Sequence, residues 1–239
     1  MARLILTVCL PPLEPGAVRQ AIADAIAPYD HNGEGEDLPP GEWYAWWLGS
    51  TGQQFWIKPG FEDDPLLIRE YETRQDGVYV SPPGRCSGGP VRLLDIHGQR
   101  SQAAADADAL WCEWEGFSSG FPPARSLDDL IAEEPEATYL HAGPAWHRYA
   151  AQPVMRAVLD DPDLQARFGQ RAVGDFGVGR DRYVRRKADE SLVHDDLLTL
   201  DGEWISSDSM PHDEYVEFFN THIDELPLDA VLVNLNYNT

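Results

Sequence analysis

Cysteine is scarce in this sequence. Only three of its 239 residues are cysteine, namely Cys9, Cys86 and Cys112, and none lies close to another along the chain. An odd number of widely separated cysteines argues against a disulfide framework and is typical of proteins of the reducing cytosol. We therefore expect a cytoplasmic protein.

Long hydrophobic runs are lacking as well. No window approaches the roughly twenty apolar residues that a membrane-spanning helix needs. The apolar run that follows Met1 is too short for a signal peptide, and Pro11 and Pro12 interrupt it. The sequence predicts neither a membrane span nor a signal peptide.

Basic residues are few compared with acidic ones. The chain has 18 Lys and Arg against 41 Asp and Glu, which gives a net charge of −23. Because phosphate groups attract positive charge, this balance argues against general binding to nucleic acids or to anionic membranes. It permits a basic partner or a mimic of nucleic-acid charge. The alternative is a solvated acidic surface that aids solubility.

Catalytic and metal-binding motifs are missing too. There is no Ser/His/Asp order, zinc-ligand set, paired-carboxylate spacing or cofactor fingerprint, so we expect no metal and no cofactor. The segment from Arg85 to Gly89 lacks the Gly-Lys-Ser/Thr ending of a phosphate-binding loop. A catalytic Cys86 would need a nearby base and an electropositive setting, and the sequence shows neither.

Clear fold signals are present in the last forty residues. Residues 197–200 and 203–206 predict two short strands, and Asp201-Gly202 between them is a strong hairpin signal because Gly accepts a positive φ. Pro211 then fits the first turn of a helix that has one apolar face. Residues 230–235 form a mostly apolar run, the pattern of a strand buried on both faces.

The start of the chain mirrors its end. Residues 4–10 predict a buried strand, and the spacing of Val18, Ile22 and Ile26 predicts a helix on the next segment. We expect the first and last strands to be central neighbours in one sheet with helices on one face, in an α+β fold of ferredoxin-like character. The prediction is a single domain over the whole chain, with irregular Trp-rich and Pro/Gly-rich insertions and a long insertion at about 59–195.

Several C-terminal residues follow a recognisable order. They are Asp201, Gly202, Trp204, Met210, Leu226, Pro227, Asp229 and 231–233. This order resembles the DG-W hairpin, Met, aromatic helix and closing apolar strand of a protein family common in actinobacteria and their phages. Residues 27–32 and 85–90 resemble two further patches of that family, whereas Asn234 and Asn236 stand where the family has its closing Asp-Cys-His. The resemblance covers about a third of the chain. Because the family has no assigned activity, the resemblance carries implications for the fold and not for a reaction.

Aromatic residues are concentrated in a short segment. Trp43, Trp46, Trp47 and Trp56 fall there, and residues 49–52 read as a turn between two strands. An exposed row of Trp would be a stacking platform or a hot spot for a protein partner. The alternative is a core position, since Trp usually buries most of its area.

Basic residues are concentrated between positions 167 and 187. Seven of the 18 fall there, including Arg180, Arg182, Arg185 and Arg186. They predict an anion site for a phosphate-bearing ligand or partner. The alternative is ion pairing with the protein's own carboxylates or a solvated face.

Three histidines are candidates for acid–base chemistry, namely His141, His147 and His194. His141 and His147 are six positions apart with no third ligand at metal spacing, so a metal site is not predicted. The alternative is that these histidines are exposed or only hydrogen-bonded.

Two functions remain open. The first is a non-enzymatic cytosolic binding protein that presents the Trp cluster or the acidic surface to a protein partner, in a phage-related or accessory-genome setting; a homodimer is open too. The second is an enzyme that acts on a phosphate-containing small substrate, with the Arg-rich segment as anion clamp. The enzyme predicts that these groups converge on one pocket, and the binding protein predicts a flat or convex exposed aromatic patch.

Overall fold

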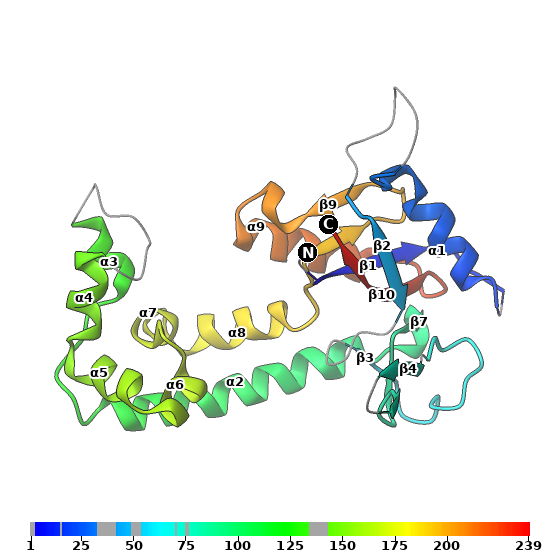
Figure 1. Cartoon of the computed structure of the whole chain (residues 1–239). Helices are drawn as coiled ribbons and strands as arrows, with labels where there is room; N and C mark the ends of the chain where they lie inside the picture. The colour runs from blue at the N-terminus through cyan, green and yellow to red at the C-terminus, as the bar shows by residue number, and fades with distance from the viewer. Residues whose placement is uncertain are drawn as a thin grey trace. The chain divides into compact units, whose positions relative to one another are not determined.

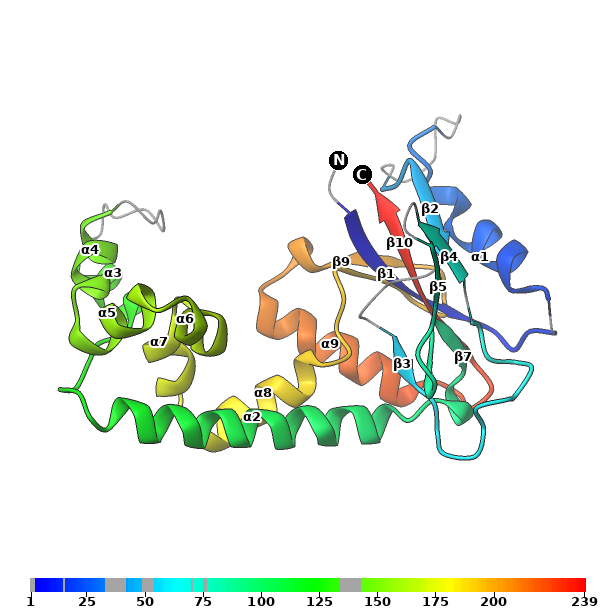
Figure 2. The same cartoon turned by 60° about the horizontal axis from the view of Figure 1, so that its bottom comes forward.

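The structure is a computed structural model that describes residues 3–14, 16–32, 42–48, 54–69, 71–74, 77–133 and 143–239. The chain divides into two compact units (Figures 1 and 2). Unit 1 consists of residues 1–100 and 189–239, and unit 2 consists of residues 101–188. Residues 59–100, which the sequence assigned to the insertion, therefore belong to unit 1.

Unit 1 is built on a mixed β-sheet. Among the described residues its strand order is β2–β10–β1–β8–β9, and β7 also pairs with β10. The strands are β1 (Arg3–Leu10), β2 (Ala45–Leu48), β7 (Gly88–Pro90), β8 (Asp196–Leu198), β9 (Trp204–Ser206) and β10 (Val231–Asn238). The first and last of these strands are central neighbours, as the sequence predicted.

The two central strands are antiparallel along their whole length. Their register runs from Arg3 opposite Asn238 to Leu10 opposite Val231. On its other side β1 is directly parallel to β8, with Leu6 opposite Asp196. A ferredoxin-like sheet is a split βαβ arrangement, in which another strand separates the two parallel strands. The α+β class is thus confirmed, and the ferredoxin-like character is not.

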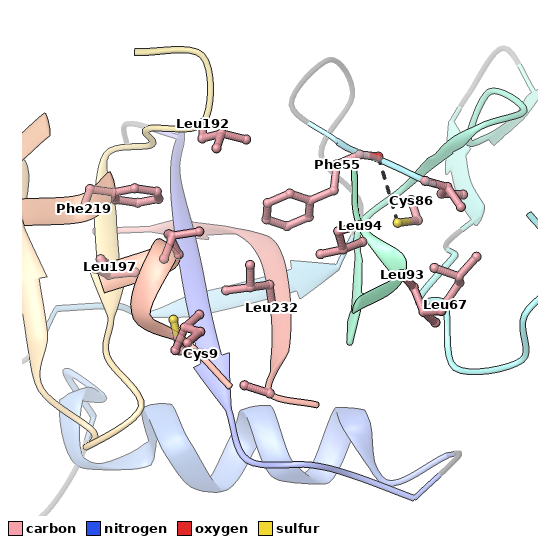
Figure 3. Close-up of a cluster of buried hydrophobic side chains, with 14 of the residues drawn as sticks. Cys9, Phe55, Leu67, Cys86, Leu93, Leu94, Leu192, Leu197, Phe219 and Leu232 are labelled. Carbon is pink, nitrogen blue, oxygen red and sulfur yellow. Dashed lines mark hydrogen bonds between the residues drawn. The ribbon is translucent and has the colours of Figure 1, made fainter. Parts of the chain in front are cut away.

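Helices cover both faces of this sheet rather than one. Ile22 and Ile26 of α1 (Val18–Ile26) belong to the same buried cluster as Val8 of β1. On the opposite face, α9 (His212–Glu225) packs Phe219 into a cluster that contains Leu232 of β10 (Figure 3). The predicted single helical face does not hold because β1 and β10 carry apolar side chains on both sides. Seven of the eight residues of β10 are buried.

The C-terminal block forms the elements that its sequence predicted. In the hairpin between β8 and β9, the Thr199 amide donates to the Glu203 carbonyl at 2.9 Å, and Gly202 has a φ of 84°. Helix α9 begins directly after Pro211 and places Asp213 in its first turn, where a negative charge stabilises the helix dipole.

The rest of unit 1 consists of short pieces. Strand β3 (Phe55–Trp56) pairs with β6 (Arg85–Cys86), and β4 (Tyr71–Arg74) pairs with β5 (Gly77–Val80). The described part of unit 1 also contains three 3₁₀ helices: η1 (Ala27–Tyr29), η2 (Val91–Leu93) and η3 (Ser207–Ser209). The turn expected at 49–52 lies outside the described residues. The strands on either side of it pair elsewhere, β2 with β10 and β3 with β6.

Unit 2 is helical in its described part. Its helices are the greater part of α2 (Ile96–Ser118), then α3 (Leu127–Ala132), α4 (Pro144–Ala150), α5 (Pro153–Asp160), α6 (Pro162–Phe168), α7 (Ala172–Gly177) and most of α8 (Arg180–Glu190). Trp114 lies at the centre of its core, stacked on Phe176 at 5.1 Å between ring centroids. No helix within the described ranges is both long enough and apolar enough to cross a membrane.

Candidate functional site

The four candidate tryptophans are partly buried and do not form one exposed row. Trp43 donates from Nε1 to the Ile26 carbonyl at 2.9 Å, and Trp46 packs against the same core cluster as Trp43. Trp47 follows Trp46 directly on β2, so the two side chains point to opposite faces. Trp56 is covered by the Arg85 guanidinium, 4.4 Å from the ring centroid.

Arginines of the basic segment pair with carboxylates of unit 2. Arg180 makes a bidentate contact with Asp108, at 2.5 and 2.7 Å, which lowers the pKa of that carboxyl. Arg186 lies 3.6 Å from Asp175, while Arg182 and Arg185 are exposed on α8. Two further pairs join Arg167 to Glu113 and Arg171 to Asp128. Much of this positive charge is therefore used within unit 2.

The three candidate histidines differ in their surroundings. His141 lies outside the described residues, and His147 is exposed on α4 of unit 2. His194, which precedes β8 in unit 1, lines a pocket. The pocket has a volume of about 410 Å³ and is lined by Glu190, Val193, His194, Asp195, Ser207, His212 and Tyr215.

Central strands of the sheet hold the His194 ring in place. Its Nδ1 lies 2.8 Å from Oγ1 of Thr7, which donates to Oδ1 of Asn234 at 2.9 Å. A Thr hydroxyl has one proton, so Thr7 can only accept from His194. The imidazole therefore carries a proton on Nδ1, and in the neutral ring Nε2 keeps its lone pair. Nε2 has no hydrogen-bond partner among the described residues.

Two further oxygens of the pocket lack protein partners in the described part of the chain. The Tyr215 side chain is fully buried, and its hydroxyl makes no hydrogen bond there. Asp195 accepts the Ile5 amide at 2.8 Å through Oδ2, whereas no described donor contacts its Oδ1. Close by, Nε2 of the exposed His212 lies 3.6 Å from Oε1 of Glu190.

Burial determines the protonation of this pocket. It lowers the pKa of His194 to about 4, so the ring is neutral at physiological pH. Burial, together with the charges of Asp196 and Asp195, raises the pKa of Tyr215, which stays protonated. The pocket thus presents the neutral imidazole of His194, the phenol of Tyr215 and the carboxylates of Asp195 and Glu190. Its lining contains no Lys or Arg.

The outer face of α9 is a second candidate surface. Phe218 on this face is 36% exposed, and Leu228 just beyond the helix is 66% exposed. A groove of about 370 Å³ runs beside Phe218 and is lined by Glu214, Glu217, Phe218, Thr221, His222 and Glu225. Residues 189–239 contain 13 Asp and Glu and no Lys or Arg. In this groove Phe218 is bordered by carboxylates, whereas Arg100 pairs with Asp224 of α9 and Arg92 pairs with Asp229 next to Leu228.

Sequence reasoning missed Asp195, Tyr215 and this face of α9. Tyr215 follows the helical spacing of core residues, and it does lie in the core; spacing cannot reveal that its hydroxyl lacks a partner. A usable signal was present in Thr7 and Asn234, which are polar residues inside strongly apolar strands. Buried polar side chains need partners, so such residues indicate a polar network nearby.

Comparisons with protein-family models, curated proteins and solved structures find no match. In the part of the chain that the structure describes, no three His, Cys, Asp or Glu side chains are grouped to hold a metal ion. Two features therefore carry the functional argument: the acceptor-rich pocket at His194 and the acidic outer face of α9.

Proposed function

We propose that this is a non-enzymatic binding protein that docks a basic segment of a protein partner on the outer face of α9. The observation that carries the proposal is an exposed apolar centre, Phe218, beside a groove that is lined by Glu214, Glu217 and Glu225 and by no Lys or Arg. We also propose the phage-related or accessory-genome setting that the family resemblance implies.

The helix is well suited to present such a face. Its inner side is fixed in the core of unit 1, where Tyr215, Phe219 and Ile223 are each at most 3% exposed. Phe218 therefore remains on the solvent side without affecting the packing of α9. The His222 ring stacks on Phe218 with 6.2 Å between ring centroids, which further orders the apolar centre.

Charge complementarity defines the partner. An apolar stripe flanked by Lys and Arg, as in a basic amphipathic helix, would place its apolar side chains against Phe218 and its cations against Glu214, Glu217 and Glu225. An acidic partner would be repelled. Because these carboxylates are exposed, we expect the association to weaken as salt is added.

The enzyme alternative has less support. Much of the basic segment that was to clamp a phosphate pairs with carboxylates of unit 2, as Arg180 does with Asp108. The pocket that contains His194 is lined by Glu190 and Asp195 and by no Lys or Arg, so it disfavours a phosphate group.

The proposal can be tested with a defined peptide. The probe is a fluorescein-labelled amphipathic helix made of Lys and Leu, and its counterpart carries Glu in place of Lys. Fluorescence anisotropy should detect binding of the Lys peptide and not of the Glu peptide. The double variant Glu217→Lys, Phe218→Ser should weaken this binding at least about tenfold, since it removes the apolar centre and reverses a charge.

Unit 1 offers a matched control. Phe61 is 45% exposed, and the nearby Asp63 is exposed too, so Asp63→Lys with Phe61→Ser makes the same two changes away from α9. The control should bind the Lys peptide within about twofold of the unchanged protein. An equal loss in both variants, or no binding of the Lys peptide at all, would rule out a docking face on α9.

A further inference from the structure

We propose that the pocket beside β8 binds a ligand through a protonated amine or guanidinium group of that ligand. Three of its lining side chains offer oxygen or nitrogen lone pairs without a protein partner among the described residues. They are Nε2 of His194, Oδ1 of Asp195 and the hydroxyl of Tyr215. The site is separate from the docking face of α9, so it does not depend on the proposed function.

The hydrogen-bonding capacity of the pocket selects a donor. An ammonium group has three N–H donors and no acceptor, and a guanidinium has five donors, so both match an acceptor-rich lining. A buried hydroxyl without a partner, such as that of Tyr215, is unfavourable until a ligand satisfies it. A ligand that brings N–H groups supplies what the protein lacks there.

The charge of the pocket selects a cation. Asp195 and Glu190 contribute carboxylates, and no Lys or Arg lines the cavity. Burial keeps His194 neutral and its Nδ1 faces Thr7, so Nε2 adds an acceptor without adding a positive charge. Phosphate or carboxylate ligands would meet the carboxylates of Asp195 and Glu190 and no Lys or Arg, and they are disfavoured for that reason.

The cation need not be a free small molecule, since a Lys or Arg side chain of a peptide carries the same group. Calorimetry with two classes of probe separates these sources. Putrescine and agmatine represent free amines, while N-acetyl-lysine amide and N-acetyl-arginine amide represent side chains. We expect at least one probe to bind with a Kd below about 1 mM, a modest affinity for a ligand of this size. The tighter class identifies the source.

The neutral isostere of putrescine provides the ligand control. We expect 1,4-butanediol, which has the same chain length without charge, not to bind. Asp195→Asn should weaken binding of the cationic probe at least about tenfold, because it removes the charge but keeps an oxygen for the Ile5 amide. Tyr215→Phe should weaken it about threefold to tenfold while leaving the fold intact, since its hydroxyl has no protein partner among the described residues.

Two further variants distinguish a specific site from general attraction to an acidic protein. Asp63→Asn changes the net charge by the same amount as Asp195→Asn, on an exposed residue outside the pocket, and should not affect binding. The variant Glu217→Lys, Phe218→Ser should also bind the amine normally. The pocket proposal is therefore tested independently of the docking face on α9. The proposal is wrong if no cationic probe binds, or if Asp63→Asn weakens binding as much as Asp195→Asn.

Discussion

Thr7 Oγ1 lies 2.8 Å from Nδ1 of His194, which connects the middle of β1 to the residue before Asp195 and β8. The Thr7 hydroxyl donates its own hydrogen bond to Asn234 on β10, so two adjacent strands orient the His194 ring. A histidine on a connecting segment thereby has the fixed orientation of a residue within the sheet.

The stability of the protein should depend on pH through His194. Its pKa is about 4 in the folded state, well below its ordinary value of roughly 6.5. Between these two values the unfolded chain takes up a proton that the folded chain does not, so the free energy of unfolding falls as pH is lowered from about 6.5 to about 4. The loss should reach at most about 3 to 4 kcal/mol, since each pKa unit corresponds to about 1.4 kcal/mol.

Urea unfolding at several pH values measures this effect. His194→Asn keeps an N–H donor toward Thr7 and should remove the part of the pH dependence that comes from His194. The difference in free energy of unfolding between the unchanged protein and the variant should therefore shrink steadily below pH 6.5. The comparison is needed because burial raises the pKa of Asp196, which adds stability as pH falls and so opposes His194. Parallel curves for the two proteins would contradict the prediction.

Gly88 should not tolerate a side chain. It pairs with Val233 across β7 and β10, and a Cβ there would fall 2.1 Å from the Leu232 carbonyl oxygen and 2.8 Å from the Val233 Cα. Both atoms are backbone of the central strand and cannot turn away. Gly88→Ala should therefore lower the free energy of unfolding by about 3 kcal/mol or more, measured by chemical denaturation.

Gly116 provides the contrasting substitution. It lies within α2, and a Cβ there would meet nothing within 4 Å. Gly116→Ala should stabilise the helix by up to about 1 kcal/mol, because Ala has the higher helix propensity. If Gly88→Ala lowered the free energy of unfolding no more than Gly116→Ala does, β7 would not approach β10 as closely as described.

Adjacent phenylalanines on α9 should respond differently to truncation. Phe219 is 1% exposed and packs in the core, so Phe219→Ala should cost about 3 to 5 kcal/mol of stability. Phe218 is 36% exposed, and Phe218→Ser should change stability by no more than about 0.5 kcal/mol. Equal losses in thermal unfolding would show that the outer face of α9 is covered.

The three cysteines should differ in reactivity. Cys112 is exposed, whereas Cys9 and Cys86 are buried, and burial raises their pKa to about 12 and about 11. Because the thiolate is the reactive form, iodoacetamide should modify only Cys112 in the native protein, as read by mass spectrometry. All three should react in denaturant. Native modification of Cys9 would show that the central sheet opens, and native modification of Cys86 would show the same for the pair of β3 and β6.

Local signals predicted the elements of the C-terminal block well. Asp201-Gly202 and Pro211 specify the hairpin and the start of α9 through their own backbone preferences, so neighbouring residues alone were sufficient. Strand β2 shows where this approach fails, since its partner is β10, nearly two hundred positions later. A pairing of that kind depends on the whole fold.

For the candidate site too, the sequence could not show which residues contact one another. The sequence singled out His194 but could not show that Thr7 fixes its tautomer or that Asp195 and Tyr215 share its pocket. It offered Arg180 as an anion clamp or as half of an ion pair, and only the bidentate contact with Asp108 distinguishes them. Both questions depend on residues brought together from separate parts of the chain.

The position of β1 determines when the sheet can assemble on the ribosome. Among the described residues its strand partners are β8 and β10, and both are translated after the whole of unit 2. A growing chain must therefore expose an apolar strand through the synthesis of residues 101–188, while the short-range contacts of that segment are already available. Nascent β1 is then a natural substrate for chaperones, and slow translation after residue 188 would prolong its exposure.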